Sequence, residues 1–287
     1  MSNKNYTPVI DQKAAKKAAA VAAKKAKKAA AEAKKAAAAV AAAVALVVAF
    51  IRFFLYGKKD AALAKWLEAE NKPYTYDGTI RIHVSDKNKK LVPNEDTAFI
   101  IWNLPAIFTC PFATLHCILA CYARKAEYSY HKEVLPARVQ NYLMSKRNDF
   151  VDIMTRYIMD VAARTKKRYI VIRIHESGDF YCRKYAEKWL QIMRNCSSDK
   201  RIKFIAYTKS FPYFDGVKLP KNFSLRASIW DDTSEKQKAI VARNGWNIYT
   251  AVEKFEKGDT FSRCRCKDCA GCRHCWQNYK DIRCQIH

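Results

Sequence analysis

Short apolar runs alternate with amphipathic stretches along most of the chain. Runs of β-branched and aromatic residues bounded by turn residues predict strands at 79–84, 97–102, 169–175, 203–208, 224–230 and 246–251. Apolar residues every three or four positions predict helices at 60–71, 111–126, 134–163, 181–195 and 234–243. Strands that alternate with helices favour an α/β fold with a mostly parallel sheet and connecting helices. Such a sheet can curl into a partial barrel, whose ligand sites lie in the loops at the carboxyl ends of the strands.

The N-terminal region has a different pattern, because residues 12–56 contain no Gly or Pro and predict one long helix. Its first half is rich in Ala and Lys, and lysines spaced eleven residues apart share one face. This face suits an anionic surface, either nucleic acid or lipid headgroups. A solvated low-complexity helix without a ligand is the alternative.

The second half of this helix is apolar. Residues 36–51 carry no charge, and the stretch as far as Tyr56 is long enough to span a bilayer. In a spanning helix the preceding lysines would stay in the cytoplasm, and everything after residue 57 would be exported. Because that would remove the cysteines from a reducing compartment, a peripheral or oligomerising helix is the other interpretation. We expect a cytoplasmic protein, with or without membrane association through residues 12–56.

The composition indicates a folded and strongly basic protein. Half of the 287 residues are hydrophobic, which is sufficient for a buried core, and the formal net charge is +26. This charge attracts nucleic acid or another polyanion, unless it only reflects a well-solvated, lysine-rich surface. We expect an Ala/Lys-rich extension at 1–59, an α/β body at 60–262 and a cysteine-rich C-terminus at 263–287.

The chain contains 11 cysteines, most of them in two groups. Cysteines separated by two residues place several thiolates around one point, as a metal requires. Disulfide scaffolds are mostly shorter chains, and an odd number of cysteines cannot pair completely. Metal ligation in a reducing compartment is therefore the better interpretation.

Within the C-terminal group, two residues separate successive cysteines from Cys266 to Cys275, as in the ligand run of bacterial ferredoxins. One iron–sulfur cluster needs four thiolates, so Cys264 or Cys284 is a spare or alternative ligand. Zinc would accept four of the same residues, with His274 or His287 as a substitute. The predicted metal ligands in this group are Cys264, Cys266, Cys269, Cys272 and Cys275.

A second group, Cys110, Cys117 and Cys121, follows the strand predicted at 97–102. Three thiolates can bind three irons of a [4Fe–4S] cluster and leave the fourth iron open for a substrate or cofactor. His116 could complete a closed site instead, and three small buried side chains are the structural alternative.

Polar residues end three of the predicted strands. His175, Ser177, Gly178 and Asp179 follow the strand at 169–175, where glycine permits a sharp turn. Asp179 could bind a ligand amine or hydroxyl and His175 could move a proton, although an Asx turn capping the next helix explains Ser-Gly-Asp equally well. Lys209, which could bind an anion, and Ser228 end the next two strands. The predicted catalytic residues are His175, Asp179 and Lys209, and the predicted cofactor contacts are Ser177, Gly178, Asp179 and Ser228.

These sequence blocks together resemble the phage-associated gene product 88 domain family over about residues 95–280. The resemblance is carried by CPFATLHCILACYARK (110–125), RIHESGDF (173–180), AYTKS (206–210), SLRASIW (224–230) and CKDCAGCRHCW (266–276). It implies a phage-associated protein but no particular activity.

The layout also looks distantly like the radical S-adenosylmethionine (radical SAM) enzymes, which have a partial α/β barrel and a three-cysteine loop after the first strand. By that resemblance Cys110, Cys117 and Cys121 would hold the open cluster. Ser177–Asp179 would lie near the amino group of S-adenosylmethionine, and the C-terminal cysteines would hold an auxiliary cluster. The spacing here is C-x6-C-x3-C, whereas that of radical SAM enzymes is C-x3-C-x2-C.

Two functional hypotheses follow. The first is a radical-SAM-like or redox enzyme with one or two [4Fe–4S] clusters, acting on a nucleotide or nucleic acid substrate. The second is a non-enzymatic nucleic-acid-binding protein with structural zinc sites.

Overall fold

The computed structural model describes residues 23, 26–32, 82–85, 88–129, 133–252, 255, 262–264, 268–277 and 281–285. The chain divides into two units, Met1–Lys58 and Lys59–His287. In the first unit residues 23 and 26–32 are helical, in agreement with the predicted Ala/Lys helix at those positions. The apolar segment 36–56 and the helix predicted at 60–71 lie outside the described residues. Within the part of the chain that the structure describes, no helix is long and apolar enough to cross a membrane.

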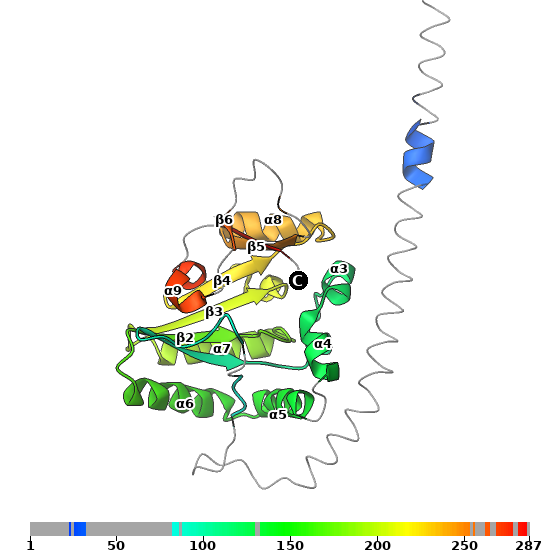
Figure 1. Ribbon diagram of the computed structural model, residues 1–287. Coiled ribbons are helices and arrows are strands. Elements are labelled where there is room, and N and C mark those ends of the chain that lie inside the picture. The colour runs from blue at the N-terminus through cyan, green and yellow to red at the C-terminus, as the bar shows by residue number, and fades with distance from the viewer. Residues whose placement is uncertain are drawn as a thin grey trace, which may run out of the picture. The chain divides into compact units, whose positions relative to one another are not determined.

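The second unit is built on one parallel sheet, with the strand order β1-β2-β3-β4-β5-β7-β6 among the described residues (Figure 1). Its strands are β1 Thr97–Trp102, β2 Tyr169–Ile174, β3 Ile202–Thr208, β4 Phe223–Ser228, β5 Asn247–Val252, β6 Ser262–Arg263 and β7 Ile282–Gln285. From β1 to β5 each strand is added beside the previous one, as in half of a (β/α) barrel. The predicted α/β fold with a curled parallel sheet is therefore confirmed.

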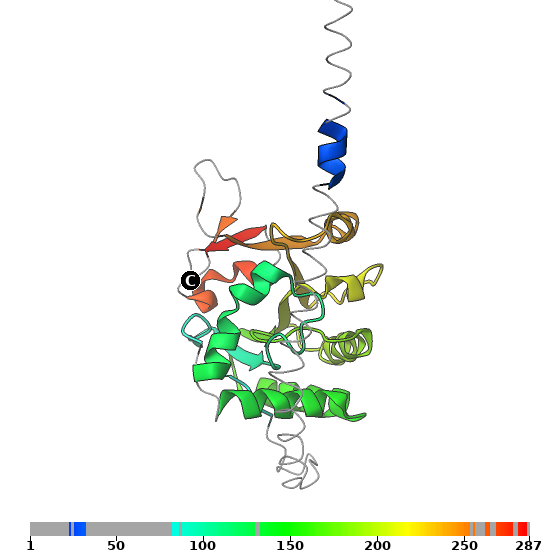
Figure 2. The ribbon, with the colours of Figure 1, turned by 90° about the vertical axis from the view of Figure 1, so that its right-hand side faces the viewer.

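Helices cover both faces of this sheet. The helices are α3 Leu115–Leu119, α4 Tyr122–Ser129, α5 Val134–Lys146, α6 Phe150–Arg164, α7 Arg183–Asn195, α8 Glu235–Asn244 and α9 Cys269–Cys272, with the 3-10 helices η2 Phe211–Phe214 and η3 His274–Trp276. Figure 2 shows α6, α7 and α8 along one face and α9 on the other. Figure 1 places α3 and α4 at the carboxyl ends of the strands and α9 toward their amino ends.

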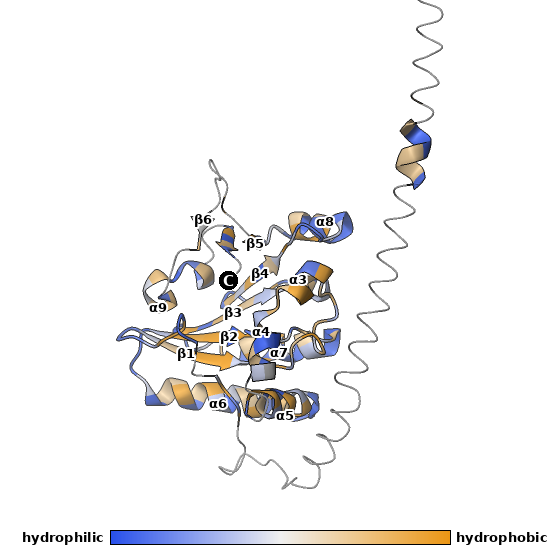
Figure 3. Cartoon of the chain, turned by 45° about the vertical axis from the view of Figure 1, so that its right-hand side comes forward, coloured by the Kyte–Doolittle hydropathy of each residue, from blue (hydrophilic) through white to orange (hydrophobic). Residues whose placement is uncertain are grey.

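Alternation along each strand decides which face a side chain covers, because successive residues point to opposite sides. Ile170, Ile172 and Ile174 of β2 pack into the large core under α6 and α7, which also contains Trp102 and Trp189. Val171 and Ile205 point to the other face, where they form a smaller core with Trp276 of η3. Figure 3 shows hydrophobic strands between helices whose outer surfaces are hydrophilic. We call the face covered by α9 and η3 the inner face.

Three predicted elements differ from the structure. The helix expected at 111–126 is divided into α3 and α4 at Ala120 and Cys121, and the one expected at 134–163 is divided into α5 and α6. The second break occurs where Arg147 adopts an extended conformation and the Lys188 ammonium donates to the carbonyl oxygens of Ser145 and Arg147, at 2.9 and 2.5 Å. Of the strand expected at 79–84, the described residues retain one antiparallel bridge, between Val84 and Trp102.

Candidate metal centres

The segment after β1 carries the first cysteine group to the carboxyl ends of the strands. The Cys110 amide donates to the Ile107 carbonyl at 3.0 Å, and Ile107 has a left-handed backbone with φ of 63°. Cys117 lies within α3 and Cys121 lies between α3 and α4. A left-handed backbone is uncommon for a β-branched residue, so the conformation of this loop is fixed by its surroundings.

The three thiols of this group lie close enough to affect one another electrostatically. Burial raises the pKa of Cys110 well above its ordinary value, and Asp179, Cys117 and Cys121 raise it further. Burial raises the pKa of Cys117 to about 11, although the nearby Lys209 ammonium lowers it. The structure therefore brings the three predicted ligands together, as protonated thiols at neutral pH.

The loop after β2 holds this cysteine segment in place. The Leu104 amide donates to the Ser177 carbonyl, and the Ser177 hydroxyl donates to the Leu104 carbonyl, both at 2.9 Å. Gly178 has φ of +79°, and a Cβ at this position would lie 2.5 Å from Thr109 Oγ1 and 2.6 Å from Leu104 Cβ. Ser177 and Gly178 were predicted as cofactor contacts, and the structure packs both against the segment that leads to Cys110.

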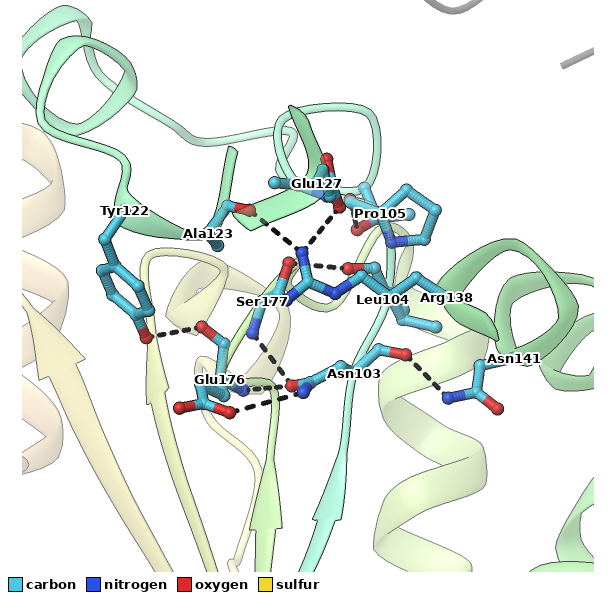
Figure 4. A network of polar contacts seen from close by, with 12 residues as sticks. Asn103, Leu104, Pro105, Tyr122, Ala123, Glu127, Arg138, Asn141, Glu176 and Ser177 are labelled. Atoms are coloured by element: carbon cyan, nitrogen blue, oxygen red, sulfur yellow. Dashed lines mark hydrogen bonds and ion pairs between the residues drawn. The ribbon is translucent and has the colours of Figure 1, made fainter. Parts of the chain in front are cut away.

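A polar network extends this support to α4 and α5 (Figure 4). The Asn103 side-chain oxygen accepts from the amides of Glu176 and Ser177, at 2.8 and 3.0 Å. The Glu127 carboxylate accepts from the Ala106 amide at 2.7 Å and from Arg138 at 2.9 Å. Glu127 and Arg138 are both buried. This pair could not be predicted from the sequence, because nothing local shows that α4 meets α5 at the cysteine segment.

The carboxylate of Asp179 is surrounded by donors from the protein itself. One oxygen accepts from the Thr208 hydroxyl at 2.5 Å and the Phe180 amide at 2.8 Å. The other oxygen accepts from the amides of Lys209 and Ser210, at 2.9 and 3.1 Å. Burial raises the pKa of Asp179, and the hydrogen bonds lower it. Asp179 therefore joins the loops after β2 and β3, whereas the structural alternative expected from the sequence was an Asx turn that caps the next helix; α7 begins after Cys182 without a side-chain cap.

His175 lies in a different environment from the cysteines. It is 2% exposed, and its Nε2 forms a hydrogen bond of 2.9 Å with the Tyr185 hydroxyl. Its ring packs against Phe180 with 4.7 Å between ring centroids, and Phe180 and Tyr185 belong to the core under the helices. Burial and the positive charge of Arg173 hold the pKa of His175 well below its ordinary value. His175 is therefore a neutral residue packed against this core, and its predicted role in proton transfer has no support from its position.

Lys209 lies beside the first cysteine group, close enough for its charge to act on the Cys117 thiol. Its ammonium lies 3.4 Å from the Ser228 carbonyl oxygen and 5.3 Å from the centre of the Trp230 ring. Burial lowers the pKa of Lys209, whereas the negative charge of a Cys117 thiolate raises it. The hydroxyl of Ser228 accepts from the Trp230 indole at 3.2 Å. Asp179, Lys209 and Ser228 thus converge from the ends of β2, β3 and β4.

An exposed polar cluster lies at the same end of the sheet. His116 Nδ1 is 2.7 Å from Asp231, and the His116 amide donates to Asp232 at 2.9 Å. Of the residues that the structure describes, these are the only three whose candidate metal-ligand atoms all lie within 4.8 Å of one another. The cluster joins α3 to the loop after β4, and exposed acidic groups of this kind are common without a metal.

The second cysteine group lies on the inner face. Asp268 caps α9 by accepting from the Gly271 amide at 3.1 Å, and the Cys269 amide donates to the Lys90 carbonyl at 2.9 Å. Burial raises the pKa of Cys269 to about 11, and Cys275 and Cys272 raise it further. Cys269, Cys272 and Cys275 therefore form a second group of neighbouring thiols.

Of the other three cysteines in the C-terminal region, the structure describes Cys264 and Cys284, which lie at the last two strands of the chain. Cys264 follows β6, and its amide donates to the Arg283 carbonyl at 2.7 Å. Cys284 is buried in β7. Burial raises the pKa of Tyr249 well above its ordinary value, and the nearby Cys284 thiol raises it further. Cys266 lies outside the described residues, so its predicted role as a ligand stays a prediction.

Cys275 has the most polar surroundings of this group. Its carbonyl oxygen accepts from the Ser224 hydroxyl at 2.7 Å and from Arg226 Nε at 3.1 Å. Burial raises the pKa of the Cys275 thiol, whereas the Tyr207 hydroxyl and the charges of Arg226 and Arg173 lower it. Arg173, Tyr207 and Arg226 were not among the residues predicted from the sequence. Alternation in the YIVIRI strand, which places Arg173 opposite the isoleucines, was the available signal.

Comparison with known proteins extends these observations. The model of the gene product 88 family matches residues 83–278. The chain is 29% identical to the Gene 88 protein of Mycobacterium phage D29 over 161 residues, which are 53% of this chain and 64% of that protein. It is 32% identical to the Gene 88 protein of Mycobacterium phage L5 over 107 residues, which are 36% of this chain and 43% of that protein.

Each match spans less than two thirds of the relative's length. No solved structure matches the chain. The family match includes β1 to β5, both cysteine groups and the loops that support them. The resemblance to the gene product 88 family is confirmed, whereas that to radical SAM enzymes stays a prediction, and this chain belongs to the gene product 88 family.

Proposed function

We propose that this protein is an iron–sulfur enzyme, redox-active or radical-SAM-like, with an open cluster at Cys110, Cys117 and Cys121. The C-terminal cysteines form an auxiliary centre, with Cys264 or Cys266 as the fourth ligand. The observation that carries the proposal is the convergence of two three-thiol groups, one at the carboxyl ends of the strands and one on the inner face. Carboxyl-end loops of parallel α/β sheets are the usual place for ligand sites.

The described cysteines are not gathered as compactly as a single zinc ion requires, which favours iron–sulfur clusters in this proposal. A tetrahedral zinc with Zn–S bonds of about 2.3 Å holds its sulfurs about 3.8 Å apart. Among the described cysteines, no three sulfurs lie within 4.8 Å of one another. In an iron–sulfur cluster each thiolate binds a different iron, so the sulfurs lie farther apart than on one zinc.

The residues around the first group have definable roles in this proposal. A [4Fe–4S] cluster held by three cysteines supplies one iron with an open coordination position. Burial keeps the thiols protonated, so metal binding must displace protons from Cys110 and Cys117. Lys209 places a positive charge beside Cys117, where it offsets thiolate charge or binds an anionic ligand. Ser177, Gly178 and Asp179 hold the two loops in a fixed arrangement.

The substrate proposed is a nucleotide or nucleic acid, because the net charge of +26 favours phosphate-rich partners. S-adenosylmethionine is the cofactor to test first. Its amino group would need a site other than the Asp179 carboxylate, whose oxygens already accept four hydrogen bonds.

Anaerobic purification, followed by measurement of iron, acid-labile sulfide and zinc per chain, tests this proposal. We expect about four to eight irons with matching sulfide and a brown protein. Zinc without sulfide would contradict the proposal and favour the alternative, a nucleic-acid-binding protein with structural zinc sites. Binding of nucleic acid across a salt series would then test that alternative.

A further inference from the structure

We propose that Arg173 is a positioning residue of the C-terminal metal centre, where it supplies a counter-charge and a hydrogen-bond donor that raise the reduction potential of the centre. This inference rests on the proposed function. It identifies a residue outside both cysteine groups as the one that adjusts the redox behaviour of one of them.

The strand register places Arg173 on the inner face. Arg173 and Val171 alternate with the isoleucines of β2, and Val171 packs in the small core with Trp276, Cys269 and Cys275. Arg173 is the register partner of Ile205 in β3, which belongs to the same core. Arg173 therefore extends from the sheet on the side where the C-terminal cysteines pack.

Tyr207 connects Arg173 to Cys275. The Arg173 guanidinium carbon lies 3.8 Å from the centre of the Tyr207 ring, a close cation–π contact. The Tyr207 hydroxyl forms a hydrogen bond with the Cys275 thiol. Tyr207 and Cys275 both pack against the small core of the inner face, so this contact holds the guanidinium on the side of the sheet where the C-terminal cysteines lie.

The donors of Arg173 are not all used by the protein. Its Nη1 is buried and has no hydrogen-bond partner among the described residues, and the same is true of the indole nitrogen of Trp276, next to Cys275. Unpaired buried donors are unfavourable, so they usually indicate a partner that the polypeptide does not supply. Metal-bound thiolates and sulfides are acceptors with negative charge, which fits both donors.

Arg226, in β4, lies two strands away from Arg173 and uses its donors differently. Its Nε donates to the Cys275 carbonyl at 3.1 Å and its Nη2 to the His274 carbonyl at 3.2 Å. Arg226 therefore fixes the backbone that carries Cys275. Arg173, by contrast, keeps its Nη1 donor for the cysteine thiolates and the sulfides of a bound cluster. Its positive charge favours reduction of that cluster because it partly neutralises the added electron.

The test compares Arg173→Gln, Arg173→Lys and, as a matched control, Arg164→Gln at an exposed position of α6. All three are made in a Cys117→Ala/Cys121→Ala background, so that only the C-terminal centre contributes. Iron and sulfide per chain and the midpoint potential are measured anaerobically by a redox titration followed by electron paramagnetic resonance. We expect Arg173→Gln to lower the potential, Arg173→Lys to lower it less, and Arg164→Gln to leave it unchanged.

An unchanged potential in iron-loaded Arg173→Gln would overturn the inference while leaving the proposed function intact. A background chain without iron would overturn the inference, and a wild-type chain without iron would overturn both. If Arg173→Gln does not fold or load, the comparison of Arg173→Lys with Trp276→Phe decides. Lower potentials in both support donation to the centre, and unchanged potentials in both refute it.

Discussion

The backbone amide of Lys209 donates a 2.9 Å hydrogen bond to the buried carboxylate of Asp179. Asp179 follows β2 and Lys209 follows β3, so the bond joins two neighbouring loops at the carboxyl edge of the sheet. Both residues were predicted to act on a ligand. Their contact shows that Asp179 positions the segment from which the Lys209 ammonium reaches the first cysteine group.

Replacing Gly178 by Ala should displace the segment that leads to Cys110. The new Cβ would lie 2.5 Å from Thr109 Oγ1 and 2.6 Å from Leu104 Cβ, at a backbone φ of +79°. We expect loss of iron from the first centre and a lower free energy of unfolding, measured by metal analysis and urea denaturation.

Gly216→Ala is the matched control for this substitution. Gly216 also has a positive φ, +71°, but nothing lies within 4 Å of its added Cβ. The free energy of unfolding of Gly216→Ala should fall by about 1–2 kcal/mol because of the left-handed backbone, and this variant should keep all of its iron. Equal iron in the two variants would show that the contact at Gly178 does not hold the cysteine segment.

The buried pair of Glu127 and Arg138 should be strongly coupled. Arg138→Met leaves the Glu127 carboxylate buried beside the Ala106 amide without its cation, at a cost of about 3–5 kcal/mol. Glu127→Gln/Arg138→Met removes the uncompensated charge and should recover part of that loss. Urea denaturation of both variants and of Glu127→Gln measures the coupling. A double variant less stable than Arg138→Met would contradict this interpretation.

His175 should make the protein less stable in acid. Its pKa in the folded state lies well below its ordinary value because it is buried, so below about pH 6.5 only the unfolded chain gains a proton there. This group should therefore cost about 1.4 kcal/mol of stability between pH 7.5 and pH 5.5. His175→Asn tolerates the φ of 61° and does not titrate, so its unfolding free energy should fall less over this range. Parallel pH profiles for the two proteins would refute the assignment.

Removal of residues 1–58 should leave the second unit folded, because that unit contains the whole sheet and both cores. The truncated protein should unfold cooperatively and keep its iron, as judged by circular dichroism and metal analysis. Aggregation of the truncated protein with loss of metal would show that the extension is integral to the fold.

Extraction of membranes with carbonate, applied to the full chain, tests attachment to a membrane through residues 12–56.

The sequence predicted β1 to β5 well, because each is a run of apolar and β-branched residues with turn residues on both sides. It did not predict β7, Ile282–Gln285, whose four residues are mixed in polarity and are stabilised by pairing with distant β5 and nearby β6. The break between α5 and α6 was also missed. It depends on a tertiary contact from Lys188, which no local pattern reveals.

The two cysteine groups could be recognised because their spacing is itself the signal, and their role as metal ligands stays a prediction. Their supporting residues were predicted less well. Ser177, Gly178 and Asp179 were located correctly at a strand end, but their hydrogen-bond partners decide that they hold loops together. His175 was expected at the same edge, yet its side chain turns into the core toward Tyr185. Arg173 was hidden within an apolar strand, where only the alternation of faces distinguishes it.

The most direct test of the two-centre account is the iron content of Cys121→Ala and Cys275→Ala, purified anaerobically beside the wild-type chain. Cys182→Ala, a single cysteine before α7, is the control. We predict that each of the first two variants loses about half of the iron, that the double variant loses all of it, and that Cys182→Ala loses none. Full iron in both Cys121→Ala and Cys275→Ala would contradict the account.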